Sequence, residues 1–400
     1  MSSTIPPAAG PADTDRPLPL TPVTMVSPVG PASYAWEATD EQVAERYGIE
    51  LSQVARFDLN TSPTPPDVAL RVLREGPLAR PICEYPPSDY RPLVIAAAKV
   101  YGVGTDEILV GAGADEVLDL IAKAYLGPGS TALVPVPTYA MYRVVSEQRG
   151  AIVRPVPRLG ADQRHGLDAP AVREAARTAA LVWLCSPNNP TGLPEDDGAV
   201  ASLLAALAED AAASGREPPV VVLDEAYAEF TGQTLLGLRE EYPRLIVVRT
   251  ASKAYALAGL RVGFAIARRE TLAPIEPYRP PGSVSVVSVS VVAEALADAA
   301  ALARNVAYLS AERERLAAEL TAAGWSIGPS VTNFLLVDFG TAQRAAMAAE
   351  ELLRRGLVPR TFGARHPLAS HLRITVRSRA ENDRLICAAG DLAVEMGGDR

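Results

Sequence analysis

The feature that most constrains the fold is an alternation of short apolar runs with segments of helical spacing, which begins at Asp67 and continues through most of the chain. The apolar runs are rich in valine, isoleucine and leucine and are bounded by turn residues, as expected of strands buried on both faces. They cover residues 107–113, 131–137, 180–187, 219–226 and 244–251. Helical spacing marks residues 67–76, 91–103, 114–129, 168–179 and 198–215. This alternation predicts an α/β protein with a largely parallel sheet.

Length, charge and cysteine content limit the class of protein. Four hundred residues, 48% of them hydrophobic, are enough for two domains or for one large domain with a smaller partner. The net charge of −9 argues against a nucleic-acid-binding protein, but it allows a small anionic substrate held by a few arginines. Cys83, Cys185 and Cys387 are too widely spaced for a disulfide framework or a metal site, so we expect a cytoplasmic protein without a bound metal.

We expect neither a signal peptide nor a membrane-spanning segment. Residues 1–32 are rich in proline, serine, threonine and alanine and have no basic cluster before an apolar stretch, which predicts a flexible tail. The longest mildly apolar window is broken by serines, Glu294 and Asp298, so we expect no contact with a membrane.

The residues that follow the predicted strands form a coherent set, and ligands of parallel sheets bind at the carboxyl ends of the strands. A glycine-containing turn at 111–116 enters a helix whose free N–H groups suit a phosphate, although an ordinary helix start explains it equally well. The loop 186–192 has the prolines and glycine of a plain turn, but it also presents two asparagine side chains. Asp224 ends a buried strand, where a carboxylate needs a cation or a strong donor; capping of the next helix is the alternative.

Lys253 follows the last buried strand, among small and apolar residues that include Ser252 and Arg261. Most lysines are solvated and inert. Desolvation and a nearby cation lower the pKa of a lysine amine, which is the condition for a Schiff-base nucleophile. A nucleophilic lysine, an aspartate able to pair a protonated pyridine nitrogen and several phosphate donors together describe a site for pyridoxal 5'-phosphate.

These residues lie in motifs by which the chain resembles the fold-type I pyridoxal-phosphate aminotransferases, and within them most nearly the histidinol-phosphate aminotransferases. The similarity runs from about Arg56 to Leu392. In chain order the motifs are YPPSDYRPL, GAGADEVLDLIAKAY, PTYAMY, SPNNPTG, LDEAYAEF, SKAYALAGLRVGF and LRITVRSRAEN. The resemblance implies the fold of aspartate aminotransferase. We expect a large cofactor domain at 61–284 with a mostly parallel sheet, and a small α+β domain formed by 33–60 with 285–400.

The resemblance also implies a role for each matching residue. Lys253 would carry the cofactor and move the proton at the substrate α-carbon, and Asp224 would keep the pyridine nitrogen protonated. Tyr227 and Asn189 would bond the phenolic oxygen of the cofactor. The phosphate would be held by the backbones of Ala114 and Asp115 and by the side chains of Ser252 and Arg261. Tyr139 would stack on the cofactor ring.

A tyrosine from the neighbouring subunit reaches the phosphate in this family, and Tyr85 matches it. The resemblance therefore implies a homodimer with composite active sites.

On the substrate side, Arg360 and Arg373 have the spacing of the family's two anion-binding arginines. The alternative is that both are ordinary surface arginines. This alternative fits Arg373 less well, because Arg373 stands in an apolar run, where an unpaired charge is costly. Asn60 matches the family's substrate segment only in part. The family's N-terminal tyrosine motif has no clear counterpart, although Tyr34 and Trp36 stand in that region.

The expected reaction is transamination from an amino donor, histidinol phosphate or a related amino acid, to a 2-oxo acid such as 2-oxoglutarate. A decarboxylase of a phosphorylated amino acid, or an aminotransferase for an aromatic or specialised amino acid, is the alternative within the same fold. A non-catalytic regulator would carry a winged-helix module in place of the short N-terminal tail, and an inert structural protein would bind no coloured cofactor.

Overall fold

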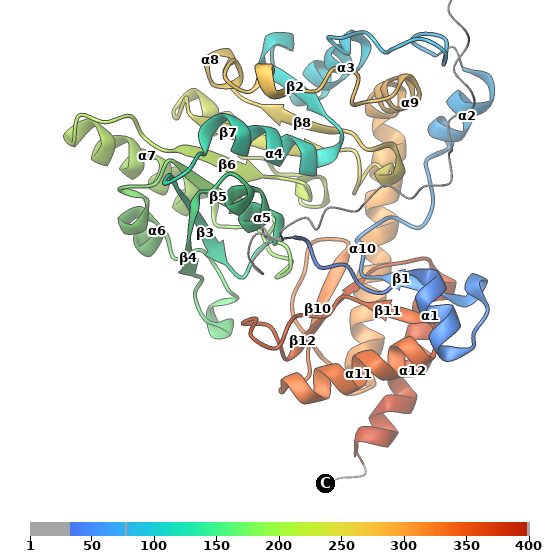
Figure 1. Ribbon diagram of the computed structural model, residues 1–400. Helices are drawn as coiled ribbons and strands as arrows, with labels where there is room; N and C mark the ends of the chain where they lie inside the picture. Colours follow the sequence, from blue (N-terminus) through green and yellow to red (C-terminus); the bar gives the residue numbers. More distant parts are fainter. Residues whose placement is uncertain (1–32, 77, 398–400) are drawn as a thin grey trace, which may run out of the picture. The chain divides into compact units, whose positions relative to one another are not determined.

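The computed structural model describes residues 33–76 and 78–397, and the predicted tail, residues 1–32, lies outside them. A central sheet has the strand order β2-β8-β7-β6-β5-β3-β4 (Figure 1). Strands β3 to β7 pair with one another in parallel, and β8 runs antiparallel between β2 and β7. The bounds are β2 Ile108–Gly111, β3 Thr131–Val136, β4 Ile152–Pro157, β5 Leu181–Cys185, β6 Val220–Asp224, β7 Leu245–Thr250 and β8 Gly263–Ile266. The predicted α/β class with a mostly parallel sheet is confirmed.

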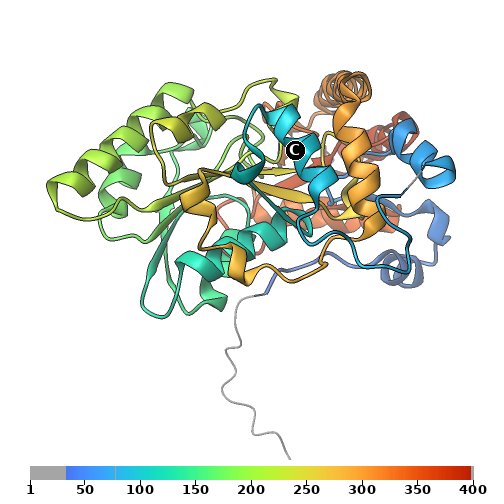
Figure 2. The same cartoon turned by 90° about the horizontal axis from the view of Figure 1, so that it is seen from above.

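Helices cover both faces of this sheet, because successive side chains of a strand point to opposite sides. Leu184 and Leu223 lie in one core cluster, whereas Trp183 and Val222 lie in another. Figure 2 shows helices on both sides of the strands. The helices packed with Trp183 are α4 (Gly113–Tyr125), α5 (Met141–Gln148) and α8 (Arg269–Leu272). The helices packed with Leu184 are α2 (Asp67–Glu75), α3 (Arg91–Tyr101), α6 (Ala169–Ala176), α7 (Asp197–Ala213) and α9 (Val286–Ala297).

Two small sheets are built from the C-terminal part of the chain and one early strand. β1 (Ala55–Phe57) pairs in parallel with β11 (Leu357–Pro359), and β10 (Phe334–Asp338) lies antiparallel between β9 (Ser326–Ile327) and β12 (His371–Thr375). The helices of this region are α1 (Asp40–Tyr47), α10 (Ala299–Ala322), α11 (Ala342–Arg354) and α12 (Arg379–Gly397). The long helix α10 runs from beside α9 to these small sheets (Figure 1).

The small sheets share a core of their own, which includes Phe57, Leu335 and Ile374. Helix α9 packs instead with the large sheet, since Val289 and Val292 belong to the core cluster of Leu184. The division into two domains with a boundary near residue 284 therefore stays a prediction, with α9 on the large-sheet side of the core.

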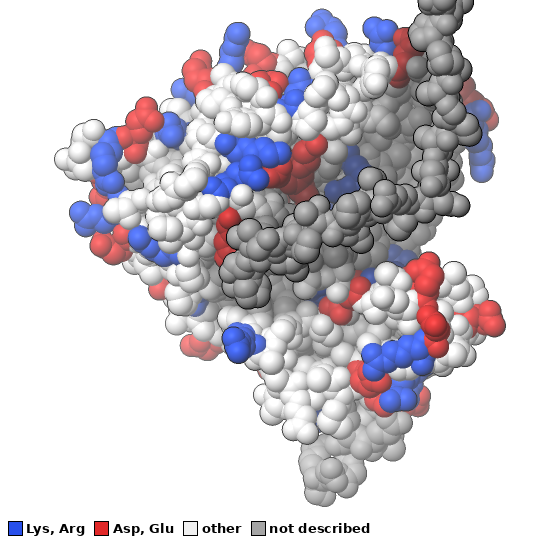
Figure 3. All heavy atoms as spheres, viewed as in Figure 1, with Lys and Arg blue, Asp and Glu red and all other residues white. Residues whose placement is uncertain are grey.

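Within the described residues no single helix is long and apolar enough to cross a membrane; the pair α9 and α10, bent by 82° at its break, meets the length and composition criteria only when taken together. On the face shown in Figure 3, lysine and arginine side chains lie among aspartates and glutamates. Many of these side chains form ion pairs, such as Lys123 with Asp119 and Arg354 with Glu350.

Candidate functional site

The carboxyl ends of β5, β6 and β7 meet at one edge of the central sheet, because these strands are parallel neighbours. Their register places Cys185 beside Asp224 and Asp224 beside Val248. A cavity of about 450 Å³ opens at this edge. The predicted site residues that line it are Asn60, Ala114, Asp115, Tyr139, Asn189, Asp224, Tyr227, Ser252, Lys253, Arg261, Arg360 and Arg373. The fold thus gathers into one cavity residues that are separated by up to 313 positions (373 − 60) in the sequence.

Lys253 presents its amine to this cavity. Its nearest polar partner is the carbonyl oxygen of Leu59, at 3.5 Å, and its amine lies 5.8 Å from the ring centre of Tyr227. No ion pair joins Lys253 to a carboxylate among residues 33–76 and 78–397. Burial lowers the pKa of the amine to about 8, and the charge of Arg373 acts in the same direction. A neutral, nucleophilic amine is therefore available at mildly alkaline pH.

Asp224 is a carboxylate that is 4% exposed and has no cationic partner in the described part of the chain. One of its oxygens accepts a hydrogen bond from the hydroxyl of Tyr142 at 2.8 Å, and the other accepts one from the N–H of Ala226 at 3.0 Å. Burial raises the pKa of this carboxyl to about 6. Because a buried carboxylate without a cation is costly, binding of a cationic N–H donor would stabilise it.

Tyr142 was not among the predicted site residues, although it belongs to the motif PTYAMY. Its ring stacks on Trp183, with centroids 5.4 Å apart and planes at 8°, which fixes the direction of its hydroxyl toward Asp224. Tyr142 lies behind the cavity wall; the residues that line the cavity without having been predicted are Asp58, Leu59, Thr61, Met141, Cys185, Ala226, Thr250 and Ala258. Most of them are close in sequence to predicted residues, and this proximity is the signal by which the sequence could have identified them.

The hydroxyl of Tyr227 accepts a hydrogen bond at 2.9 Å from the side-chain amide of Asn60. Asn60 has a positive φ of 53°, and its backbone N–H donates to the hydroxyl of Thr375 at 2.9 Å. Strained backbone of this kind often occurs where a side chain must be aimed at a site. Because burial raises the pKa of Tyr227, its hydroxyl keeps its proton and remains a donor toward the cavity. The structure places Asn60 beside Tyr227; its predicted contact with substrate stays a prediction.

A cradle suited to a phosphate lies at the N-terminus of α4. A Cβ at Gly263 would overlap the backbone of Gly113 and Ala114, and a Cβ at Gly113 would overlap the guanidinium of Arg261. The two glycines thus allow β8 and Arg261 to approach the start of α4 closely. Arg261 lies 3.2 Å from a carboxylate oxygen of Asp115, and both side chains are about half exposed.

The remaining predicted groups of the cradle lie around it. The hydroxyl of Tyr139 donates to Asp115 at 2.9 Å, and the hydroxyl of Ser252 accepts from Thr250 at 3.0 Å. Free N–H groups at a helix start, an arginine and a hydroxyl are the donors that phosphate-binding sites use.

The loop after β5 uses its two asparagines differently. Asn188 is buried and structural: its amide oxygen accepts from Thr138 at 2.7 Å and from Arg158 at 3.3 Å. Asn189 lines the cavity, and its amide oxygen accepts from Arg373 at 2.7 Å. One asparagine therefore fixes the loop, and the other reaches the site.

Arg373 and Arg360 are joined by backbone hydrogen bonds, each N–H donating to the carbonyl oxygen of the other at 3.0 Å. Residues opposed in this way in antiparallel chains project their side chains to the same face, and both arginines line the cavity. The guanidinium of Arg373 is buried, donates to Asn189 and to the carbonyl oxygen of Asp58, and leaves its Nε without a partner. Within residues 33–76 and 78–397 it forms no ion pair with a carboxylate, which is the condition of an anion-binding site.

One predicted site residue does not line the cavity. Tyr85 is 88% exposed and is absent from the cavity wall. Its predicted role concerns a second subunit.

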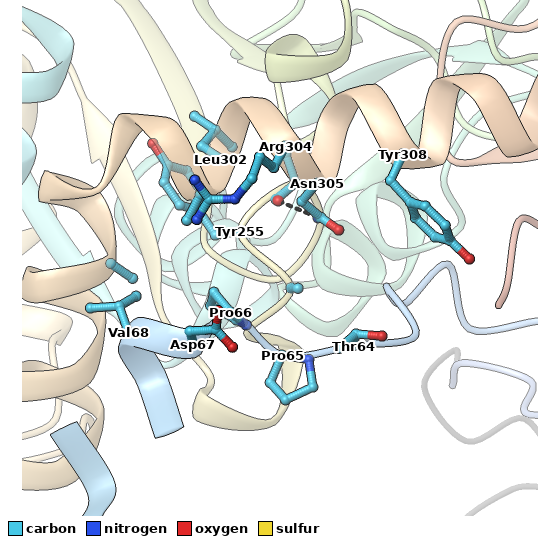
Figure 4. Close-up of a pocket in the computed structure, with 14 residues that line it drawn as sticks. Thr64, Pro65, Pro66, Asp67, Val68, Tyr255, Leu302, Arg304, Asn305 and Tyr308 are labelled. Carbon is cyan, nitrogen blue, oxygen red and sulfur yellow. Dashed lines mark hydrogen bonds between the residues drawn. The ribbon is translucent and has the colours of Figure 1, made fainter. Parts of the chain in front are cut away.

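A second cavity of about 270 Å³ lies between α10, the start of α2 and the residues after Lys253 (Figure 4). The amide of Asn305 donates to the carbonyl oxygen of Ala254 across it, at 2.6 Å. Its charged residues, Asp67 and Arg304, are both exposed to solvent. Because it contains no buried ionic group, it lacks the chemistry of the first cavity.

Comparisons with known proteins agree on one family. Residues 51–388 match the family model described as aminotransferase class I and II. The histidinol-phosphate aminotransferase of Symbiobacterium thermophilum is 36% identical over 341 residues, which are 84% of this chain and 90% of that relative. The enzyme of the same name from Thermococcus gammatolerans is 36% identical over 350 residues, 86% of this chain and 94% of that relative.

Among solved structures, histidinol-phosphate aminotransferase from Sinorhizobium meliloti, in complex with pyridoxal 5'-phosphate, superimposes with a TM-score of 0.81 at 26% identity. The match covers 90% of this chain and 96% of that one.

Proposed function

The chain belongs to the class I and II aminotransferases, which use pyridoxal 5'-phosphate, and on that premise we propose that it moves an amino group from histidinol phosphate or a related amino compound to a 2-oxo acid such as 2-oxoglutarate. The observation that carries this proposal is the charge pattern of the cavity. Lys253, Asp224 and Arg373 line it, and none of the three forms an ion pair within the described residues. Each needs a partner that the cofactor or the substrate supplies.

The residues present fit this cofactor. The buried carboxylate of Asp224 would pair with the protonated pyridine nitrogen, and the hydroxyl of Tyr227 would donate to the ring oxygen. The N–H groups at the start of α4, the hydroxyl of Ser252 and the guanidinium of Arg261 would hold the phosphate. Tyr139 and Asn189 complete the proposed set around the ring.

When bound, the cofactor supplies an aldehyde that condenses with amines and a ring that withdraws electrons from the neighbouring carbon atom. The chain contributes the proton chemistry. The amine of Lys253, with its pKa lowered to about 8, takes a proton from the substrate α-carbon and returns it. Arg373 holds the substrate's anionic group, so that the carbon to be deprotonated faces this amine.

The substrate proposal rests on the anion site and on the relatives. Arg373 offers bidentate donors to a carboxylate or a phosphate monoester alike. Histidinol phosphate carries a phosphate and no carboxylate, whereas 2-oxo acids carry a carboxylate, so one guanidinium can serve both half-reactions. The names of the two relatives support histidinol phosphate as the donor.

We further propose a homodimer in which Tyr85 reaches the cofactor phosphate of the neighbouring subunit. Tyr85 is 88% exposed, and the apolar side chain of Ile82, three positions earlier in the sequence, is 77% exposed. Exposed aromatic and apolar side chains of this size are typical of a subunit interface. The proposed compartment is the cytoplasm, since Cys83, Cys185 and Cys387 are all free.

The test is to purify the protein with pyridoxal 5'-phosphate and to follow its absorbance as single donors are added: histidinol phosphate, glutamate, aromatic amino acids and threonine phosphate. We expect one donor to convert the cofactor to its amine form, and Lys253→Ala to abolish the conversion. Lys99→Ala, on the exposed face of α3, is the control. Release of carbon dioxide without conversion would instead show a decarboxylase, and absence of a bound chromophore would refute the proposed role of Lys253.

The small number of lysines sharpens this test. The chain contains three, Lys99, Lys123 and Lys253. Borohydride reduction followed by peptide mass analysis should therefore place the cofactor on one of three peptides, and we expect the peptide of Lys253.

A further inference from the structure

The two arginines of the cavity differ in their electrostatic state. Arg373 has no carboxylate partner in the described chain, whereas Arg360 already has one. The guanidinium of Arg360 lies 3.6 Å from a carboxylate oxygen of Glu37 and donates to the carbonyl oxygen of Ala35 at 2.6 Å. The side chains of Arg360 and Glu37 are only 15% and 18% exposed, so this pair is largely shielded from water.

Residues 33–38, which we call the leading segment, bring Glu37 to this place. The guanidinium of Arg360 lies 5.0 Å from the ring centre of Tyr34, and the ring of Trp36 lies 4.8 Å from that of Tyr34. Tyr34, Trp36 and Arg360 all line the cavity. The same oxygen of Glu37 accepts hydrogen bonds from the N–H and the hydroxyl of Thr361, both at 2.9 Å. The chain thus inserts its own carboxylate beside the second arginine of the substrate cavity.

This arrangement bears on a problem that every transamination poses, because two different substrates enter one cavity in turn. Under the proposed function, the donor has one anionic group and an aromatic side chain, and the acceptor has two carboxylates. Arg373 suits the anion that each of them carries. Arg360 can bind the second carboxylate of the acceptor only if it exchanges Glu37 for that carboxylate.

We propose that Glu37 is an exchangeable counter-ion of Arg360 and thereby sets the preference of the cavity between substrates with one anionic group and substrates with two. With Glu37 in place, Arg360 is neutralised, and the rings of Tyr34 and Trp36 offer a wall to an aromatic side chain. When a dicarboxylate enters, its distal carboxylate replaces Glu37 on Arg360. This inference rests on the proposed function for the identity of the two substrates, but its test does not require turnover.

The test compares two unreactive ligands of equal chain length, glutarate with two carboxylates and pentanoate with one. Their binding to the holoenzyme is measured by calorimetry for the wild type and for Glu37→Gln. The amide oxygen of the variant keeps the hydrogen bonds from Thr361, so the leading segment retains its anchor, while the competing charge is removed. Glu41→Gln, on the exposed face of α1, is the matched control.

We expect Glu37→Gln to increase the affinity for glutarate about tenfold, because the substitution removes one partly shielded contact between like charges. The affinity for pentanoate should stay within about twofold of the wild-type value. Glu41→Gln should change neither. In an Arg360→Met background, Glu37→Gln should no longer affect glutarate, because the exchange site is gone.

Unchanged or weaker glutarate binding in Glu37→Gln, or a shift of glutarate and pentanoate together, overturns the proposal. The same holds if the effect persists without Arg360. Failure of the proposed function would be recognised separately, because no amino donor would then convert the bound cofactor in the wild type.

Discussion

Replacement of Asp224 by asparagine should make the cofactor-free protein more stable and cofactor binding much weaker. The carboxyl is 4% exposed, and burial raises its pKa from 3.8 to about 6. A raised pKa means that the folded state binds the proton more tightly than the unfolded state does. The stabilisation of the folded state by this proton is therefore present below pH 4 and is lost as the pH rises through about 6.

The size of the effect follows from the shift. About two pKa units correspond to about 3 kcal/mol of destabilisation at pH 8, and to about half as much at pH 5, where the unfolded carboxyl is ionised but the folded one is not. Asparagine carries no charge, and its amide can still bond with Tyr142 and with the N–H of Ala226. Asp224→Asn should therefore gain up to about 3 kcal/mol at pH 8 and clearly less at pH 5.

The assay is urea unfolding of the cofactor-free protein at both pH values, with Asp106→Asn, at an exposed carboxylate, as the control. Cofactor affinity is measured in parallel by spectral titration. A variant no more stable than the wild type at pH 8, or a gain that is equal at pH 5 and pH 8, would refute the reasoning. Retention of full cofactor affinity would refute the proposed pairing with the pyridine nitrogen.

Three further predictions concern other parts of the site. Gly263→Ala should weaken cofactor binding at least tenfold in a spectral titration, because its Cβ would displace the start of α4, whereas Gly259→Ala, with open space around it, should not. Arg158→Met should lower the free energy of unfolding by about 3–5 kcal/mol by leaving a buried glutamate unpaired, against less than about 1 kcal/mol for the exposed Arg177→Met. Labelling of the Lys253 amine in the cofactor-free protein, followed by mass analysis, should rise with pH through about 8, well below the ordinary lysine value of 10.5; a rise only near 10.5 would contradict the burial argument.

Much of the fold could be predicted because the buried parallel strands are continuous apolar runs that need no distant partner to be recognised. Two strands of the central sheet were not predicted. β4 contains Pro155 and Pro157 and mostly exposed side chains, a pattern that only an edge strand tolerates. β8 is four residues long and begins at Gly263, so nothing in its own sequence separates it from the loop that carries Lys253.

The same contrast applies to the site. Asn189, Asp224 and Lys253 were predictable because each stands at the end of a strand or in the loop that follows it, and parallel strands end at one edge. The partnership of Glu37 with Arg360 joins positions 323 residues apart (360 − 37), and it depends on the backbone pairing of Arg360 with Arg373. Local composition contains no signal for such a contact. The resemblance suggested that Arg360 binds substrate, but not that the chain supplies its own competing anion.

The charges of the cavity connect stability to function. Burial lowers the pKa of Lys253 from 10.5 to about 8 and raises that of Asp224 from 3.8 to about 6, so each charged group destabilises the cofactor-free fold at neutral pH by about 3 kcal/mol. Together these costs are comparable to the whole stability of a small domain, which is about 5–15 kcal/mol. The two groups attract each other, but no ion pair joins them in the described residues, and burial remains the larger influence on each pKa. If stability alone mattered, apolar residues would serve better than Lys253 and Asp224 at these positions. The presence of both groups in one cavity is therefore the physical reason to regard this edge of the sheet as the place where the chain does chemistry.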